Sequence, residues 1–298
     1  MHYRVLGSTG MRISVIGVGT WQFGGEWAHD FSQAEVDDIL DQASACGINF
    51  IDTAECYGDH LSEKLIGDYL RRRDRSQWIV ATKFGHYFHS FMRRTDDYST
   101  GGARLQLESS LQALGVETID LYQFHSGPDP AFHNDELWKM LDEQKRAGKI
   151  RHLGLSILGK GSVAQAAETR SVGAEVLQVV YNRLDQRPEQ DYFPQAMRTQ
   201  LGILARVPLA SGLLTGKYKP GAAFLPNDYR STLDAEKLNR DLDEVEHLRT
   251  AEVPAGVPMA QWALAWCLRN PAVSAVIPGC KDAAQVRANA TAADLLQD

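Results

Sequence analysis

Residues 48–58 carry the sequence INFIDTAECYG, in which a short apolar run ends on Asp52 and Tyr57 follows five positions later. A run of this length, placed directly after a helical pattern, is typical of a buried strand. Asp52 is then expected at the carboxyl end of that strand. A charge there needs a partner or a function, because buried charges are rarely left unpaired. The stretch therefore predicts a buried strand that presents an acid at its end.

Two later segments repeat this arrangement. Residues 78–82 (WIVAT) lead into Lys83, and residues 119–124 (IDLYQF) lead into His125. Three predicted strands thus end on three different ionisable side chains.

The chain as a whole alternates short apolar runs with amphipathic helical stretches, the pattern of parallel strands joined by crossover helices. Eight strands are expected, near residues 18–20, 50–52, 79–82, 121–125, 152–156, 176–180, 202–205 and 275–277. Eight such units predict a closed (β/α)8 TIM barrel, whose active site lies at the carboxyl ends of the strands. With 298 residues and 44% hydrophobic content, one barrel accounts for the chain as a single domain over residues 1–298.

Two segments fall outside the eight units. Residues 3–6 and 13–16 flank the sequence GSTG at positions 7–10, which predicts an amino-terminal β-hairpin that plugs one end of the barrel. Residues 211–231, between the seventh and eighth strands, are rich in Gly, Pro and polar residues. Long loops of this kind in compact domains are usually functional or mobile.

The composition excludes several classes of partner. The net charge is -7, with 38 acidic and 31 basic residues, so neither a nucleic acid nor a membrane surface is expected. The amino terminus lacks the apolar core of a signal peptide and no run of about 18 apolar residues occurs, so a cytoplasmic location is expected. The four cysteines form no Cys-x-x-Cys pair, and His86 and His89 lack a third ligand, so no metal site is predicted.

The ionisable set has a consistent chemistry. Asp52, Lys83 and His125 follow the second, third and fourth predicted strands, so they are neighbours around one mouth, with Tyr57 in the loop above Asp52. A nearby ammonium lowers the pKa of a tyrosine toward the working pH. Asp52 would hold Lys83 charged, and His125 would hydrogen-bond the substrate oxygen. The set predicts proton transfer at a carbonyl compound, with Tyr57 as the acid.

Other functions fit parts of the same pattern. Taken alone, Asp52 and Lys83 could form a buried ion pair that only fixes two neighbouring strands. Lys83 could serve as a Schiff-base amine in a lyase or aldolase barrel, although Asp52 would hold that amine charged. A regulatory subunit that binds a cofactor and turns over slowly would carry the same residues.

The four residues and their surroundings resemble the aldo-keto reductase family. The resemblance rests on Asp52, Tyr57, Lys83 and His125 and on the segments GTW at 19–21, TKF at 82–84, GKIR at 148–151, GLS at 154–156, PLASGLLTGK at 208–217 and IPG at 277–279. These segments occur in order over nearly the whole chain.

The resemblance implies a nicotinamide cofactor that lies extended across the barrel mouth. Hydride would pass between its ring and an aldehyde or ketone, possibly a sugar, while Tyr57 gives the proton. No Gly-x-Gly-x-x-Gly motif opens a helix after a strand, so a separate Rossmann domain is not expected. NADP is favoured over NAD, which remains possible, and the oligomeric state is left open.

By similarity, Ser156 and Gln178 would hold the nicotinamide carboxamide. Small residues near Ser211 suit the pyrophosphate, and Lys281 at a helix start suits a 2′-phosphate. The full set of expected cofactor contacts is Gly19, Thr20, Trp21, Ser156, Gln178, Arg206, Pro208, Leu209, Ser211, Gly212, Lys217, Arg230, Gly279, Lys281, Gln285 and Asn289.

Three positions depart from the family pattern. Ile157 stands where many relatives have Asn, Ala288 stands where many have an acid, and Arg206 stands where many place an aromatic ring against the nicotinamide. A guanidinium can stack on a ring or point at a phosphate.

The substrate pocket is expected to be aromatic. Its candidate wall residues are Trp21, Trp27, Phe84, His86 and Tyr87. Such walls suit small aldehydes, ketones or sugars. Arg93 and Arg94 are expected to face solvent, and would attract an acidic substrate if they did not.

Overall fold

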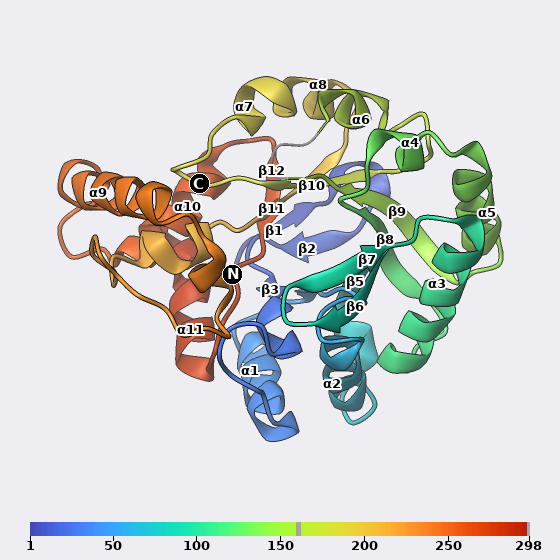
Figure 1. Cartoon of the computed structure of the whole chain (residues 1–298), viewed down its shortest axis with the longest axis horizontal. Helices are drawn as coiled ribbons and strands as arrows, with labels where there is room; N and C mark the ends of the chain where they lie inside the picture. The colour runs from blue at the N-terminus through green and yellow to red at the C-terminus, as the bar shows by residue number, and fades with distance from the viewer. Residues whose placement is uncertain (159–161, 297–298) are drawn as a thin grey trace.

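A computed structural model describes residues 1–158 and 162–296 of the chain (Figure 1). Eight parallel strands form one sheet, and helices surround it. The strands are β3 (Val18–Gly19), β4 (Phe50–Asp52), β5 (Ile79–Phe84), β8 (Ile119–His125), β9 (Ile150–Ser156), β10 (Val176–Val180), β11 (Gly202–Arg206) and β12 (Val273–Val276).

The sheet closes on itself. Each strand pairs with the next in the order β3, β4, β5, β8, β9, β10, β11 and β12. Isolated parallel bridges then join Ile16 to Val276 and Gly19 to Gly279, and Gly17 N donates to Val276 O at 2.8 Å. The predicted (β/α)8 barrel is therefore confirmed, and the eighth strand lies slightly earlier than expected because Val273 already pairs with Ile203 of β11.

The amino-terminal hairpin closes one end of the barrel, as predicted. It consists of β1 (Tyr3–Val5), a 3₁₀ turn η1 (Gly7–Thr9) and β2 (Arg12–Ser14). Its apolar residues Leu6, Met11 and Ile13 join the cluster inside the barrel. The backbone of Gly7 lies so close to Gly202, the first residue of β11, that a Cβ there would be 2.1 Å from Gly202 N. The hairpin thus seals the amino ends of the strands and leaves their carboxyl ends for the site.

The helices cover the outside of the sheet with their apolar faces. The α-helices are α1 (Gln33–Ala45), α2 (Leu61–Leu70), α3 (Thr100–Leu114), α4 (Asp129–Phe132), α5 (Asp135–Arg146), α6 (Val163–Glu168), α7 (Pro188–Asp191), α8 (Phe193–Arg198), α9 (Ala235–Ala251), α10 (Met259–Arg269) and α11 (Ala283–Ala290). The remaining 3₁₀ segments are η2 (Trp21–Gly24), η3 (Arg75–Gln77), η4 (Ala210–Thr215), η5 (Tyr229–Thr232) and η6 (Thr291–Leu295).

Side-chain caps mark the first residues of several helices. Ser32 and Glu35 form a capping box at α1, and Asp234 accepts from Lys237 N at the start of α9.

No described helix is long and apolar enough to cross a bilayer.

One element was not predicted. A second hairpin, β6 (His86–Ser90) and β7 (Arg93–Asp96), follows β5 directly and pairs antiparallel over the barrel mouth (Figure 1). Most of its residues are polar and none is fully buried, so its sequence lacks the apolar alternation that marks a strand.

Candidate active site

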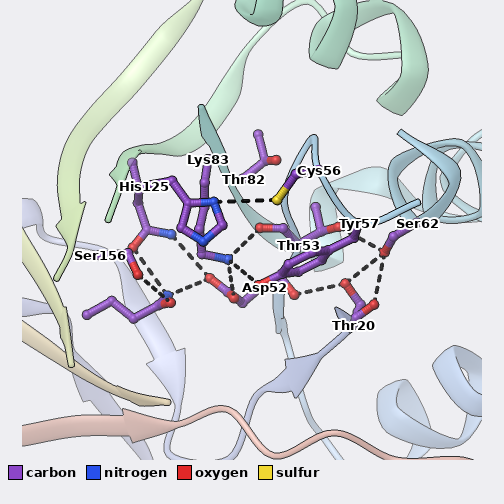
Figure 2. Close-up of polar contacts among 12 residues, drawn as sticks. Thr20, Asp52, Thr53, Cys56, Tyr57, Ser62, Thr82, Lys83, His125 and Ser156 are labelled. Atoms are coloured by element: carbon purple, nitrogen blue, oxygen red, sulfur yellow. Dashed lines mark hydrogen bonds and ion pairs between the residues drawn. The ribbon is translucent and has the colours of Figure 1, made fainter. Parts of the chain in front are cut away.

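Lys83 lies at the centre of the polar cluster at the carboxyl ends of the strands. Its ammonium donates to Asp52 Oδ1 at 2.7 Å, to the Thr53 carbonyl oxygen at 2.7 Å and to Tyr57 Oη at 3.3 Å (Figure 2). Lys83 is 0% exposed and Asp52 is 3% exposed. Side chains alternate along a strand, so Lys83 of β5 faces the barrel interior, where Asp52 ends the neighbouring strand β4. The predicted set of Asp52, Tyr57 and Lys83 is brought together.

The second oxygen of Asp52 is held by two amides. Gln178 Nε2 donates to Oδ2 at 2.7 Å, and Gln123 Nε2 donates to it at 3.2 Å. Gln123 was not predicted as a site residue. The signal was present, because Gln123 lies two positions before His125 and alternate residues of a strand share a face. Both oxygens of the buried acid are thereby occupied by donors.

The structure corrects the predicted pKa of Tyr57. Burial raises it to about 12, and the attraction of Lys83 only partly opposes this effect. The expectation of a lowered value was wrong because desolvation of the phenolate outweighs one nearby ammonium that Asp52 already neutralises. Burial also works against the Lys83 ammonium, but Asp52 and Tyr57 outweigh it and raise the pKa of Lys83. Tyr57 is therefore a protonated acid at neutral pH.

His125 completes the set in its neutral form. Burial lowers its pKa well below the usual range, and the positive charges of Lys83, Arg206 and Arg94 add to this effect. The centroid of its ring lies 6.2 Å from the centroid of the Tyr57 ring, and the angle between the two ring planes is 82°. A neutral imidazole beside a phenol can donate a hydrogen bond to an oxygen that also accepts from the phenol.

The loop that carries Tyr57 is fixed by close packing. Gly24 of η2 lies against it so tightly that a Cβ there would be 2.6 Å from the Tyr57 carbonyl carbon. Below the loop, Ser62 Oγ donates to Thr20 Oγ1 at 2.9 Å and accepts from Thr53 Oγ1 at 2.9 Å (Figure 2). Thr20, predicted as a cofactor contact, is buried at 1% exposure and donates to the Asp52 carbonyl oxygen.

Aromatic side chains border Tyr57 on the side of η2. The Trp21 ring stacks on the Tyr57 ring at 6.2 Å and 27°, and Trp27 meets Trp21 edge-on at 5.3 Å. Tyr229 of η5 lies 4.7 Å from Trp21 and was not predicted. His86 lies 4.8 Å from the His125 ring, and Tyr87 follows it on β6 with a half-buried side chain.

Phe84 is a correction. Its side chain is 0% exposed and packs on Tyr122 and Phe124 in the layer between the sheet and the helices. It follows Lys83 on β5, so it points the opposite way, and it cannot line the mouth. The prediction of Phe84 as a pocket wall was wrong.

Arg94 is a second correction. It does not face solvent, because its side chain is 16% exposed and pairs with Glu26, which is itself 1% exposed. Glu26 also accepts from Trp21 Nε1 at 2.7 Å and from Met92 N at 2.9 Å. Glu26 therefore ties the β6–β7 hairpin to the Trp21 wall, while Arg93 is exposed as expected.

The expected carboxamide contacts lie side by side. Ser156 Oγ donates to Gln178 Oε1 at 3.3 Å, and both side chains are 1% exposed. Arg206 ends β11, and its Nη2 donates to the Ile157 carbonyl oxygen at 2.9 Å. The Arg206 Nε atom is buried without a hydrogen-bond partner in the described structure. An unpaired buried donor beside Ser156 and Gln178 fits a site that receives a planar, polar group.

The expected phosphate contacts form two groups. Ser211 and Gly212 have positive φ in η4, and Lys217 is exposed just beyond. Lys281 is exposed before α11, its N–H donates to Gln285 Oε1 at 3.0 Å, and Asn289 is buried on the same helix. Pro208 and Leu209 lead into η4, and Gly19 and Gly279 form the bridge that closes the barrel.

Arg230 does not lie free for a phosphate. It is 7% exposed, pairs with Asp228 through Nε at 2.8 Å and Nη2 at 2.6 Å, and donates to Tyr218 Oη at 2.7 Å. Asp228 therefore neutralises its charge, and Arg230 fixes the segment after η4. A Cβ on Gly212 would lie 3.6 Å from Arg230 Nη1, so Arg230 also lies beside the expected phosphate loop, and its contact with a pyrophosphate stays a prediction.

Among the described residues, one group of three side chains could bind a metal ion. It consists of Glu55, Cys56 and His125, whose ligand atoms lie within 4.8 Å of one another. Burial raises the pKa of the Glu55 carboxyl to about 8 and raises that of the Cys56 thiol. The Lys83 and Arg94 charges face the same space and oppose a dication. His86 and His89 instead bond Asp96 and Thr95 at 2.8 Å.

Comparisons with known proteins agree with this geometry. A model of the aldo/keto reductase family matches residues 15–298. An aldo-keto reductase from Bacillus halodurans, solved in its holo form, superposes with a TM-score of 0.82 at 30% identity over 99% of this chain and 91% of that chain. A glycerol dehydrogenase from Gluconobacter oxydans superposes with a TM-score of 0.80 at 30% identity over 97% and 88%.

A curated relative extends the comparison. An NADH-specific methylglyoxal reductase from Escherichia coli (strain K12) is 29% identical over 97% of this chain and 93% of its own length. The match of the family model covers nearly the whole chain and includes the four residues of the site. The chain therefore belongs to the aldo/keto reductase family.

Proposed function

We propose that this protein reduces small aldehydes, ketones or sugars, with NADP(H) as its preferred cofactor and Tyr57 as the proton donor. As an aldo/keto reductase, the chain is an oxidoreductase that interconverts a carbonyl compound and the corresponding alcohol. The observation that carries the roles within the site is the position of Lys83, which contacts Asp52 and Tyr57 at once while 0% exposed.

The proton is handled by this chain's own residues. Tyr57 holds it at neutral pH because burial raises the phenol pKa to about 12. As negative charge develops on the substrate oxygen, Tyr57 releases the proton to it, and the Lys83 ammonium stabilises the phenolate that remains. Asp52 keeps Lys83 charged and directed at Tyr57. Neutral His125 donates a hydrogen bond to the same substrate oxygen and orients it.

The residues present fit a nicotinamide cofactor. Ser156 and Gln178 offer a hydroxyl and an amide to a carboxamide, and no separate nucleotide-binding domain is required. The bound nicotinamide supplies the hydride in reduction and accepts it in alcohol oxidation. Lys281 at the start of α11 suits a 2′-phosphate, which favours NADP. NAD is the second candidate, since one relative is an NADH-specific reductase.

The substrate is proposed to be small and uncharged. Trp21, Trp27 and Tyr229 surround one side of Tyr57, and Arg94 is neutralised by Glu26. Methylglyoxal and glycerol, the compounds in two relatives' names, are of this class. A cytoplasmic location is favoured by the four cysteines, which are all free thiols.

The Schiff-base alternative is disfavoured by one distance. Lys83 Nζ lies 2.7 Å from Asp52 Oδ1, and that ion pair holds the amine protonated and non-nucleophilic. If borohydride trapped a substrate adduct on Lys83, the Schiff-base alternative would be supported after all.

The test is a panel of aldehydes, ketones and sugars with NADPH and NADH, repeated with Tyr57→Phe. The phenol is the only proposed proton donor, so we expect kcat to fall more than about 10²-fold. NADPH binding, measured by fluorescence, should change little, because Tyr57 is not among the expected cofactor contacts. Full activity in Tyr57→Phe would refute the mechanism. Tight cofactor binding without turnover of any substrate in the wild type would instead indicate a regulatory subunit.

A further inference from the structure

The charges around the barrel mouth do not cancel. Lys83 is neutralised by Asp52, and Arg94 is neutralised by Glu26. His125 is neutral because burial lowers its pKa well below its ordinary value. Among residues 1–158 and 162–296, no carboxylate pairs with Arg206, whose hydrogen bond goes to a backbone carbonyl oxygen. The mouth therefore carries one uncompensated positive charge.

The position of that charge is defined by two strands. Arg206 ends β11, and its Nη2 bonds the Ile157 carbonyl oxygen just beyond β9, at 2.9 Å. Strand β10 lies between β9 and β11. The guanidinium thus crosses the carboxyl end of β10, next to the adjacent Ser156 and Gln178 side chains. Its charge acts on Tyr57 and Asp52 from this position.

The reaction requires the cofactor ring to lie in the same space. The substrate oxygen bonds Tyr57, and a hydride donor must lie about 3–3.5 Å from the substrate carbon. A nicotinamide held at Ser156 and Gln178 meets this requirement only near the end of β10, which the guanidinium crosses. The unpaired Nε and the planar shape of Arg206 suit stacking on an aromatic ring.

The two redox states of that ring differ in charge. The reduced nicotinamide is neutral, whereas the oxidised ring carries one positive charge. A fixed cation in a buried site repels the oxidised ring and leaves the reduced ring unaffected. We propose that Arg206 makes the site selective for the reduced cofactor over the oxidised one, so that the enzyme takes up the reduced form in preference and releases the oxidised form readily. This inference rests on the proposed function, since it assumes that a nicotinamide binds at Ser156 and Gln178.

The expected effect is measurable. Two like charges about 5 Å apart would repel by more than about a hundredfold in affinity at an effective dielectric constant of about 20. Arg206 is only partly buried and also feels the Asp52 carboxylate, so we expect a screened effect of roughly tenfold. Tighter binding of the reduced form by tenfold raises the reduction potential of the bound two-electron couple by about 30 mV.

The experiment measures dissociation constants of the nucleotide-free protein for NADPH and NADP⁺, by quenching of tryptophan fluorescence. Wild type should bind NADPH about tenfold more tightly than NADP⁺. Arg206→Met, which keeps length and loses charge, should bring the ratio of the two constants close to one. Arg206→Lys keeps the charge and should keep most of the ratio.

Three outcomes would overturn the inference. The first is a wild type that binds NADP⁺ as tightly as NADPH, which needs no variant and decides the matter even if the variants fail to fold. The second is an Arg206→Met protein that weakens or strengthens both forms equally. The third is an Arg206→Met protein in which the ratio of the two dissociation constants is unchanged and only the KM for carboxylate-bearing substrates rises. That result would show that Arg206 contacts the substrate rather than the cofactor. A wild type that binds neither nucleotide would contradict the proposed function instead.

Discussion

Asp52 is the residue on which the site depends, because three side-chain donors converge on its carboxylate. Lys83 holds one carboxylate oxygen, and Gln123 and Gln178 hold the other. This arrangement explains why a charged lysine tolerates complete burial. A buried ammonium without its acid would leave a desolvated charge, which is among the most unfavourable states in a protein interior.

Replacement of Asp52 by Asn should therefore affect stability as well as activity. We expect the free energy of unfolding, from urea titrations, to fall by about 3–5 kcal/mol, because Lys83 keeps its burial and loses its counter-charge. Asp68→Asn, which removes an ion pair to Arg71 that is about half exposed, is the matched control and should cost under about 1 kcal/mol. Equal losses in the two variants would contradict this account of Asp52.

Glu55 should make stability depend on pH. Burial raises its pKa to about 8, so the folded protein keeps a proton on Glu55 that the unfolded chain releases near pH 4.5. Stability is then lost as pH rises between these values, by up to about 1.4 kcal/mol per pH unit.

Glu55→Gln removes that titration. Between pH 5 and pH 8 the wild type should lose stability relative to Glu55→Gln, so the unfolding free energy of the variant should rise relative to that of the wild type. Above pH 8 the difference between the two should stay constant. Urea unfolding at a series of pH values checks this, and a difference that does not change with pH would exclude a buried, protonated Glu55.

At the residue level, sequence patterns predicted the identities of the reacting groups but not their environments. Asp52, Lys83 and His125 each end an apolar run and Tyr57 follows one closely, and those positions were sufficient to group them. The pKa of Tyr57 could not be predicted, because it depends on how completely the surrounding loops exclude water. Phe84 could have been excluded from the pocket, since it neighbours inward-facing Lys83 on one strand.

Among the elements, the β6–β7 hairpin is the one that we expect to affect substrate binding most directly. It lies over the mouth and is held by Glu26, which lies between η2 and α1 and binds Arg94, Met92 and Trp21 together. The sequence does not reveal this contact, because a single buried acid in a loop carries no periodic signal. The eight strands of the barrel were predictable because short apolar runs that alternate with longer helical patterns are typical of buried parallel strands.

Arg94→Met should loosen the hairpin and the Trp21 wall. We expect KM to rise about tenfold or more with a smaller change in kcat, because the wall residues shift while Tyr57 stays fixed by Gly24. Arg93→Met, one residue earlier and exposed, should leave both constants unchanged. A fall in kcat at constant KM in Arg94→Met would indicate that Arg94 acts on the reacting groups rather than on the wall.

On the scale of the whole molecule, the amino-terminal hairpin and the active site occupy opposite ends of the barrel. This separation allows stability and chemistry to be changed independently. Gly7 has a φ of 55° and lies within van der Waals contact of the β11 backbone, whereas Gly10 has a φ of 73° and open space around it.

Gly7→Ala should therefore destabilise the protein more than Gly10→Ala. Both carry the strain of a left-handed alanine, about 1–2 kcal/mol, and only Gly7→Ala adds a clash with Gly202. We expect a larger fall in Tm for Gly7→Ala, measured by circular dichroism, with unchanged kcat at about 25 °C for the folded fraction. Similar Tm values would show that the hairpin moves away from β11 without cost.

The closure of the barrel also has a consequence for biosynthesis. The bonds between Gly17 and Val276, and between Gly19 and Pro278, join one segment to another that is synthesised much later. Until then the growing chain is an open sheet with two unpaired edges and an apolar interior, the kind of surface on which nascent chains aggregate. This protein is therefore expected to depend on chaperones during translation more than its folded stability would indicate.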